Sequence, residues 1–224
     1  ADEVIVLDSF SSDRTREICE SYSVRFYQLE WKGYSNAKNY ANSLATKDYL
    51  LSLDADEVLS EELQKSIINL KLNPDADAYT VNRLTYYCGR WVKHGGWYPE
   101  RKTRIFKKEA ATWEGSVHED LCFKTNPSIH NLPGHLLHYS YRTVDTHIKK
   151  SLAYATLAAK RDAEAGKKRT LFVHGLVKPW FFFMRQYFFK AGFLDGYQGF
   201  VLAVISALER FLRYVKYEEL KRNR

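Results

Sequence analysis

Two apolar runs, each ending in an aspartate, constrain the fold of this chain more than any other feature. Val4–Leu7 ends at Asp8, and Tyr49–Leu53 ends at Asp54. Continuous apolar runs of this length are typical of strands buried on both faces of a parallel sheet. A helical pattern between them predicts strand–helix–strand alternation, and therefore a wound α/β fold.

The other expected elements follow along the chain. Helices are expected from Ser11–Asp13 through Tyr22, over residues 35–45, and from Ser60 to a stop at Asn73–Pro74, with a strand over 24–29. Short alternating segments among Gly, Pro and Trp predict irregular, partly antiparallel structure over residues 78–141. After Asp145 the pattern is helical to the end, with breaks at Gly166 and over 192–199.

The net charge of +7 is concentrated in the last third of the sequence. Residues 141–224 hold 17 Lys+Arg and 7 Asp+Glu, whereas residues 1–140 hold 17 and 20. Aromatic residues crowd the same basic region, and the run Phe200–Ile205 is too short to span a bilayer, which needs about 20 apolar residues. These features favour an interfacial amphipathic helix. The alternatives are a solvated basic face and aromatic rings that pack on the sheet.

The ends and the cysteines indicate the compartment. Cys19, Cys88 and Cys122 are far apart and form no paired motif, so neither a disulfide framework nor a zinc site is indicated, and a reducing compartment is expected. No signal peptide is recognisable at the start. An apolar strand pattern begins almost at Ala1, which predicts a chain that starts inside a domain.

The sequence Asp54-Ala55-Asp56 carries the sharpest chemical signal. In a wound α/β sheet, ligands bind beyond the carboxyl ends of the strands, so both carboxylates are expected in the binding crevice. Carboxylate oxygens suit Mg²⁺ or Mn²⁺ shared with substrate phosphates. Asp8 also follows a strand, and it either accepts hydrogen bonds from a nucleotide or forms the loop and caps a helix.

Several segments together resemble a known family. The first set is Val6-Leu7-Asp8-Ser9-Phe10-Ser11-Ser12-Asp13-Arg14-Thr15, Asn36-Ala37-Lys38-Asn39-Tyr40-Ala41 and Leu53-Asp54-Ala55-Asp56-Glu57. It resembles family 2 inverting glycosyltransferases of GT-A fold. The second set narrows the resemblance to the bacterial lipopolysaccharide-core glucosyltransferase group: Gly96-Trp97-Tyr98-Pro99, Arg104-Ile105-Phe106, Trp113-Glu114-Gly115-Ser116-Val117-His118-Glu119 and His138-Tyr139-Ser140-Tyr141.

This resemblance implies a particular organisation. We expect a GT-A-like, mostly parallel sheet in residues 1–143, with a nucleotide half (1–77) and an acceptor half (78–143). Residues 144–224 would form a helical, basic, membrane-apposed extension. The family usually begins with an additional βα unit that holds the nucleotide. That first strand is absent from this sequence, which predicts weak donor binding or a fragment of a longer protein.

The resemblance also implies roles for individual residues. Glu119 would be the general base, with Asp120 as the alternative, and His138 or His118 would join Asp54 and Asp56 as a metal ligand. Alternatively, each histidine is a hydrogen-bonded structural residue, and Arg101 and Arg104 lie on a solvated face. The implied donor site comprises Asp8, Ser9, Lys38, Asp54, Asp56, Arg101 and Arg104.

The implied activity is transfer of a hexose, with glucose favoured, from UDP-hexose to a lipid-linked saccharide such as lipopolysaccharide core. The Gln-x-x-Arg-Trp motif of processive synthases is missing, so one sugar per encounter is expected. A divalent cation, Mn²⁺ or Mg²⁺, would be the cofactor. The protein would be cytoplasmic and would bind peripherally to the inner membrane. No nucleic-acid partner is expected.

Two other classes compete with this interpretation. In a haloacid-dehalogenase-like phosphatase, Asp54 would be the nucleophile and Asp56 the acid/base, but the sequence shows no later acidic pair after a suitable apolar run. A non-enzymatic, basic membrane- or nucleic-acid-binding module would use the aromatic residues as platforms. No signature of a common nucleic-acid-binding fold accompanies them.

Overall fold

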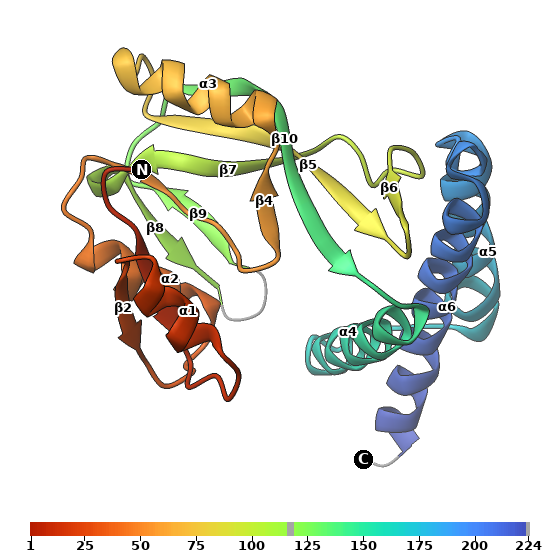
Figure 1. The fold of residues 1–224 in the computed structure, drawn as a ribbon. Coiled ribbons are helices and arrows are strands. Elements are labelled where there is room, and N and C mark those ends of the chain that lie inside the picture. Colours follow the sequence, from red (N-terminus) through yellow and green to blue (C-terminus); the bar gives the residue numbers. More distant parts are fainter. Residues whose placement is uncertain (116–118, 223–224) are drawn as a thin grey trace. The chain divides into compact units, whose positions relative to one another are not determined.

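The computed structural model describes residues 1–115 and 119–222 and has a mixed α/β fold with helices toward the C-terminus (Figure 1). The fold class expected from the sequence is therefore confirmed. The strands are β1 (Ile5–Asp8), β2 (Arg25–Gln28), β3 (Tyr49–Leu51), β4 (Glu57–Leu59), β5 (Ala78–Tyr87), β6 (Arg90–Val92), β7 (Glu100–Lys107), β8 (Ala111–Glu114), β9 (Asp120–Phe123) and β10 (Ile129–Tyr141).

The helices lie near the predicted positions, although the first begins at Thr15 with Arg14 at its N-cap position, and not at the expected caps Ser11–Asp13. Among the described residues, the α-helices are α1 (Thr15–Ser21), α2 (Tyr34–Leu44), α3 (Glu61–Leu72), α4 (Val144–Glu164), α5 (Lys178–Met184) and α6 (Gly196–Arg222). The 3₁₀ helices are η1 (Lys108–Ala110) and η4 (Gly192–Asp195), and the π-helical segments are η2 (Leu171–Val177) and η3 (Arg185–Phe189).

The chain divides into two compact units. Unit 1 comprises Ala1–Ala55, Glu61–Val81 and Arg101–Gly134, and unit 2 comprises Asp56–Ser60, Asn82–Glu100 and His135–Arg224. Strands β5, β7 and β10 contribute residues to both units. The division differs from the boundaries that the sequence suggested, and the functional halves drawn there remain predictions.

Strand pairing is mixed, with a smaller parallel share than the strand–helix alternation suggested. β1 and β2 pair in parallel and form their own two-stranded sheet, whereas a larger sheet has the order β3-β7-β5-β10-β4, with β6 beside β5. The pairs β3–β7, β4–β10, β5–β6 and β8–β9 are antiparallel. The residues of β1 and β3 are mostly only half-buried, unlike the fully covered strands expected from their apolar runs.

Each unit has its own hydrophobic core. In unit 1, buried Ala78, Phe106, Ala111 and Trp113 form a cluster against which Leu50 packs. In unit 2, Tyr87, Val92, Tyr141 and Leu202 form a second cluster. Because Leu202 belongs to α6, the last helix is part of the core of unit 2.

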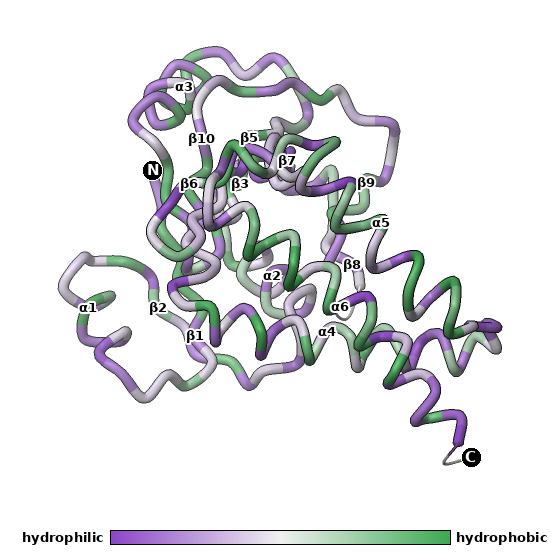
Figure 2. The backbone as a smooth tube through the Cα atoms, turned by 90° about the vertical axis from the view of Figure 1, so that its right-hand side faces the viewer, coloured by the Kyte–Doolittle hydropathy of each residue, from purple (hydrophilic) through white to green (hydrophobic). Residues whose placement is uncertain are grey.

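The helices of unit 2 break close to the predicted positions. α4 ends at Glu164, just before Gly166, and the next break lies at Lys190 and Ala191, one residue before the predicted range of 192–199. Gly199 instead lies inside α6, where a Cβ atom would come within 1.9 Å of the carbonyl oxygen of Gly192. Figure 2 shows hydrophobic residues along both α5 and α6.

Within the described residues, no single helix has the length and apolar character needed to cross a membrane. Leu171–Phe189 and Gly192–Arg222, which meet at an angle of 71°, reach that length and composition only when taken as a pair.

Candidate active site

Helix α2 is fixed to strand β8 by a reciprocal amide clamp. The Asn39 side-chain nitrogen donates to the Trp113 carbonyl at 2.8 Å, and the Trp113 backbone N–H donates to the Asn39 side-chain oxygen at 2.9 Å. One turn earlier, the Ser35 hydroxyl donates to the Gly115 carbonyl at 2.6 Å. These three bonds position the helix face that carries Lys38.

Lys38 joins two of the predicted site carboxylates. Its ammonium lies 2.9 Å from Oδ1 of Asp54 and donates to Oε1 of Glu119 at 2.8 Å. It also sits 4.6 Å from the ring centre of Trp113, within the range of a cation–π interaction. The structure therefore brings Lys38, Asp54 and Glu119 together within unit 1.

Arg104 neutralises the other oxygen of Asp54. The antiparallel pairing of β3 with β7 continues to Ser52, whose N–H donates to the Arg104 carbonyl. The Arg104 guanidinium then contacts Oδ2 of Asp54 at 2.6 Å. Burial tends to raise the pKa of Asp54, but the charges of Arg104 and Lys38 outweigh it and hold that pKa below its ordinary value. Asp54 is therefore an ionised carboxylate between two cations.

Asp8 lies at the carboxyl end of β1, as predicted, and is buried in its own loop. The Ser11 hydroxyl donates to Oδ1, and the Ser11 N–H donates to Oδ2 at 2.9 Å. The hydrogen bond from the Ser11 hydroxyl is the main cause that lowers the pKa of Asp8 below its ordinary value, whereas burial acts in the opposite direction. Its carboxylate thus shapes the β1–α1 loop, while Ser9 next to it is exposed.

The two candidate bases have different surroundings. Glu119 is half-buried and bonded to Lys38, whereas Asp120 is an exposed residue of β9 that pairs in register with Glu114 of β8. Arg101, predicted as a donor contact, is also exposed on β7. His118 lies outside the described residues.

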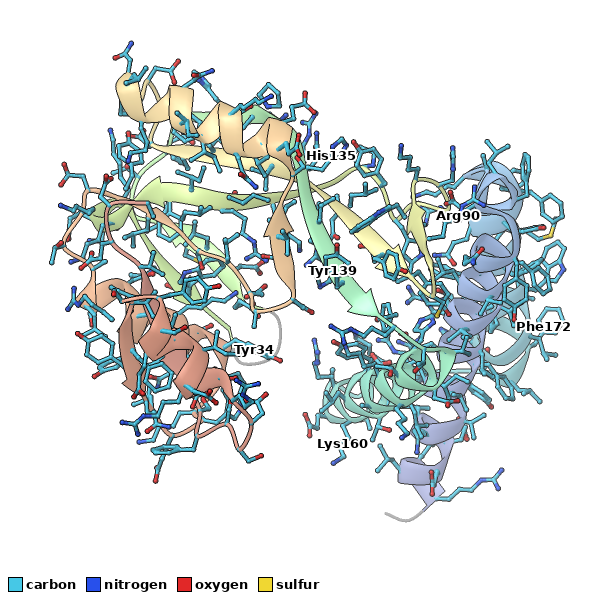
Figure 3. The ribbon with its side chains drawn as sticks, viewed as in Figure 1. Tyr34, Arg90, His135, Tyr139, Lys160 and Phe172 are labelled. Carbon is cyan, nitrogen blue, oxygen red and sulfur yellow. The ribbon has the colours of Figure 1, made fainter. Side chains whose placement is uncertain are left out.

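Unit 2 carries the second aspartate of the motif. His138 Nε2 lies 3.3 Å from Oδ2 of Asp56, and the Tyr139 N–H donates to the Asp56 carbonyl at 2.9 Å. These contacts follow from the antiparallel pairing of β4 with β10, which places Glu57 opposite His138. Figure 3 labels Tyr139 and His135 on the same strand.

A buried acid next to Asp56 was not singled out from the sequence. The side chain of Glu57 is fully buried, with Arg83 at 3.6 Å, and Arg83 also forms a two-pronged ion pair with Glu100 at 2.8 and 2.9 Å. The sequence signal that could have identified Glu57 is its position as an acidic residue directly after the Asp-x-Asp motif. The arginine that compensates it is 26 positions further along the chain, beyond any local pattern.

The donor atoms around Asp56 suit a hard divalent cation. Asp56 offers a carboxylate, and His138 offers the ring nitrogen Nε2, which lies 3.3 Å from Oδ2 of that carboxylate. Magnesium commonly uses one or two protein carboxylates and completes its shell with water and substrate phosphates. Over residues 1–115 and 119–222, no cluster of three or more His, Cys, Asp or Glu side chains is arranged as a metal site.

Comparisons with known proteins agree with the predicted class. Residues 1–126 match the family described as Glycosyl transferase family 2. An uncharacterized glycosyltransferase of Rickettsia typhi is 32% identical over 98% of this chain and 78% of its own length. The lipopolysaccharide core biosynthesis glycosyltransferase LpsC of Rhizobium meliloti is 29% identical over 96% of this chain and 82% of its own.

Among solved structures, residues 1–349 of S. aureus TarS align at 16% identity and a TM-score of 0.48, over 99% of this chain and 82% of that chain. The family match covers more than half of the chain, and the Rickettsia relative covers nearly all of it. The chain therefore belongs to glycosyl transferase family 2. This membership favours a glycosyltransferase over the phosphatase and the non-enzymatic binding module.

Proposed function

We propose that this chain transfers a hexose, with glucose favoured, from a nucleotide-sugar donor to a lipid-linked saccharide at the inner-membrane surface. Family membership supports the transferase chemistry, and the similarity to LpsC favours a lipopolysaccharide-core acceptor. The single observation that carries the proposal is Lys38, which joins Asp54 of the predicted donor site to the predicted base, Glu119.

The proposed reaction is one in-line displacement. The acceptor hydroxyl oxygen forms a bond to the anomeric carbon while the bond from that carbon to the nucleoside diphosphate breaks, so the configuration inverts. Glu119 takes the hydroxyl proton. Its Oε1 already accepts the hydrogen bond from Lys38, so we assign proton transfer to Oε2.

Negative charge develops on the departing diphosphate, and two cations lie beside Asp54 to offset it. Lys38 and Arg104 are both largely buried, and buried preorganised charges stabilise a transition state more strongly than solvated ones do. We further propose that Asp8, Ser9 and Arg101 contact the nucleotide or its phosphates. Asp8 would do so from the rigid loop that its hydrogen bonds to Ser11 create.

A divalent cation fits the residues present. Asp56 and His138, both in unit 2, would hold it. When bound, such a cation withdraws charge from the leaving group as a Lewis acid. The exposed carboxylate of Asp56 is an oxygen donor of the kind that Mg²⁺ and Mn²⁺ prefer, and the half-buried imidazole of His138 would add a nitrogen donor.

A donor screen tests the proposal. The chain is incubated with a panel of nucleotide hexoses, Mn²⁺ and solubilised lipopolysaccharide core, and released nucleoside diphosphate and the anomeric configuration of the product are measured. We expect UDP release and a product of inverted configuration. Retention of configuration would contradict the single displacement. Phosphate release from p-nitrophenyl phosphate, without sugar transfer from any donor, would favour the phosphatase.

A further inference from the structure

The helices of unit 2 expose large apolar side chains in an almost unbroken stretch of the chain. We call the exposed apolar residues of η2, α5, η3, η4 and the first half of α6 the hairpin surface. Its most exposed members include Phe172 (labelled in Figure 3), Trp180, Phe189 and Tyr197, each more than 60% accessible. Single exposed apolar residues are common, but a contiguous apolar patch of this kind marks an interaction surface.

A groove brings part of the hairpin surface together in space, including Trp180. It has a volume of about 740 Å³ and runs between the η2–α5 segment and α6. Leu176, Trp180 and Phe183 line one side, and Val204, Leu208 and Phe211 line the other. No described residue that lines it is charged. Because the groove has apolar walls, water gains little from filling it and an apolar occupant is favoured.

The exposed charged side chains of residues 170–208 have one sign. Between residues 170 and 208 the basic residues Lys178, Arg185 and Lys190 are all exposed. The acidic residue in this stretch, Asp195, is buried and accepts hydrogen bonds from the backbone of Lys93 and His94. An approaching partner therefore meets cations around an aromatic and aliphatic centre.

This combination selects among possible occupants. A symmetric dimer through the hairpin surface would bring the same cations toward one another, which opposes association. An anionic bilayer complements both properties, since basic side chains near such a surface contribute about 1 kcal/mol each. Aromatic rings prefer the boundary between headgroups and acyl chains. The 71° bend between the two helical segments suits a pair that lies along an interface.

We propose that the hairpin surface docks on an anionic lipid bilayer, with Trp180 and the neighbouring Phe rings at the acyl boundary and lipid chains in the groove. Lys178, Arg185 and Lys190 contact the lipid phosphates. The role of docking rests on the proposed function, because docking would bring the chain to a lipid-linked acceptor. Docking itself requires neither donor nor acceptor and is measured without them.

Co-sedimentation of the full chain with vesicles tests the proposal. We expect binding to vesicles containing phosphatidylglycerol to be at least about tenfold tighter than to pure phosphatidylcholine, and to weaken with salt. Trp180→Glu and Leu208→Glu each place a charge at the boundary and should weaken binding roughly tenfold or more. Trp31→Glu and Ile68→Glu are matched controls, because both residues are exposed but belong to unit 1.

Three results would overturn the proposal. Equal binding of the Trp180→Glu and Trp31→Glu variants would show that the hairpin surface is not the contact. Equal affinity for neutral and anionic vesicles would remove the role of the cations. A dimer in sedimentation equilibrium that Trp180→Glu dissociates would make the surface a protein interface. Circular dichroism and thermal unfolding of each variant establish that it is folded.

A transfer assay in detergent separates this proposal from the proposed function. There the acceptor is solubilised, so Trp180→Glu should retain the wild-type kcat while losing vesicle binding. Vesicle binding by a wild-type chain that transfers sugar from no donor would contradict the proposed function alone. Transfer in detergent without any vesicle binding would contradict docking alone.

Discussion

Lys38 donates a hydrogen bond to Oε1 of Glu119 at 2.8 Å, although 81 positions separate the two residues in the sequence. The same ammonium lies 2.9 Å from Asp54, so one cation serves two carboxylates. The clamp between Asn39 and Trp113 fixes the helix that presents it. This arrangement makes the roles of base and counter-ion separable by mutation.

The assignment of the base is tested by two neighbouring substitutions. Glu119→Gln removes the proton acceptor with little change in size and should lower kcat by roughly 10²–10⁴-fold. Asp120→Asn changes an exposed side chain of β9 and should leave kcat within a few-fold. Initial rates of nucleotide release at saturating donor measure both. The opposite ranking would identify Asp120 as the base.

The role of Lys38 is tested by Lys38→Met, which keeps the aliphatic chain and removes the charge. A hydrogen bond to a charged group contributes about 1.5–3 kcal/mol, so kcat/KM for the donor should fall about 10–100-fold. Lys71→Met is the matched control, because Lys71 also forms an ion pair, with Asp2 at 2.8 Å, but at an exposed position. If both variants have the same kcat/KM, Lys38 does not act on the donor.

Metal binding is tested at the Asp56–His138 pair. His138→Gln and Asp56→Asn should each raise the Mn²⁺ concentration for half-maximal activity by roughly tenfold or more. His130 and Asp75 form an exposed pair at the same 3.3 Å distance, so His130→Gln is the matched control. Electron paramagnetic resonance of free Mn²⁺ gives the affinity independently of activity. Unchanged affinity in His138→Gln would exclude that histidine as a ligand.

The sequence predicts the order of elements because that order depends on local periodicity. The apolar run ending at Asp8 is β1, and the helices expected over 35–45 and before Asn73 are α2 and α3, displaced by one or two residues at most. Local patterns cannot specify strand partners. Tyr49–Leu51 has the run of a buried strand, yet its antiparallel partner is Ile105–Lys107, more than fifty positions later.

In the candidate site, too, local sequence patterns predict some residues, whereas the contacts between distant residues could not be predicted. Residue type and strand position identified Asp54 and Asp56, and the family resemblance supplied Lys38 and Glu119. Contacts such as Asn39 with Trp113 and Arg83 with Glu57 depend on long-range packing, which no local window contains.

The pH dependence of stability is tested at His147. Its ring is buried on α4, and its Nδ1 lies 3.0 Å from the Tyr87 hydroxyl. Burial, assisted by the charge of Lys150, lowers the pKa of His147 from 6.5 to about 4. Between these pH values the unfolded chain binds more protons than the folded one. Stability should therefore decline as the pH falls from 6.5 toward 4, by up to about 3 kcal/mol.

His147→Phe removes this titration while keeping a ring in the core. The difference between the wild-type and variant free energies of unfolding, measured in urea at each pH, isolates the contribution of the histidine. We expect the difference to change across this interval and to be constant above pH 7. A pH-independent difference would show that His147 does not stay neutral in the fold.

The attachment of α6 to α4 is tested at Asp162. This carboxylate is 1% exposed and accepts two hydrogen bonds from Arg213 of α6, at 2.7 and 2.9 Å, with Arg169 also in contact. Burial opposes ionisation, but Arg213 and Arg169 hold the pKa of Asp162 below its ordinary value. The carboxylate therefore contributes stability above pH 4 that is lost as it is protonated in acid.

Asp162→Asn leaves two arginines without their shared anion and should lower the free energy of unfolding by about 3 kcal/mol. Glu20→Gln breaks an exposed pair with Arg16 and should cost less than about 1 kcal/mol. The double variant Asp162→Asn/Arg213→Met should be less destabilised than the sum of its single changes, because the buried cation is removed together with its partner. Strict additivity would mean that the two side chains do not stabilise the α4–α6 contact through each other.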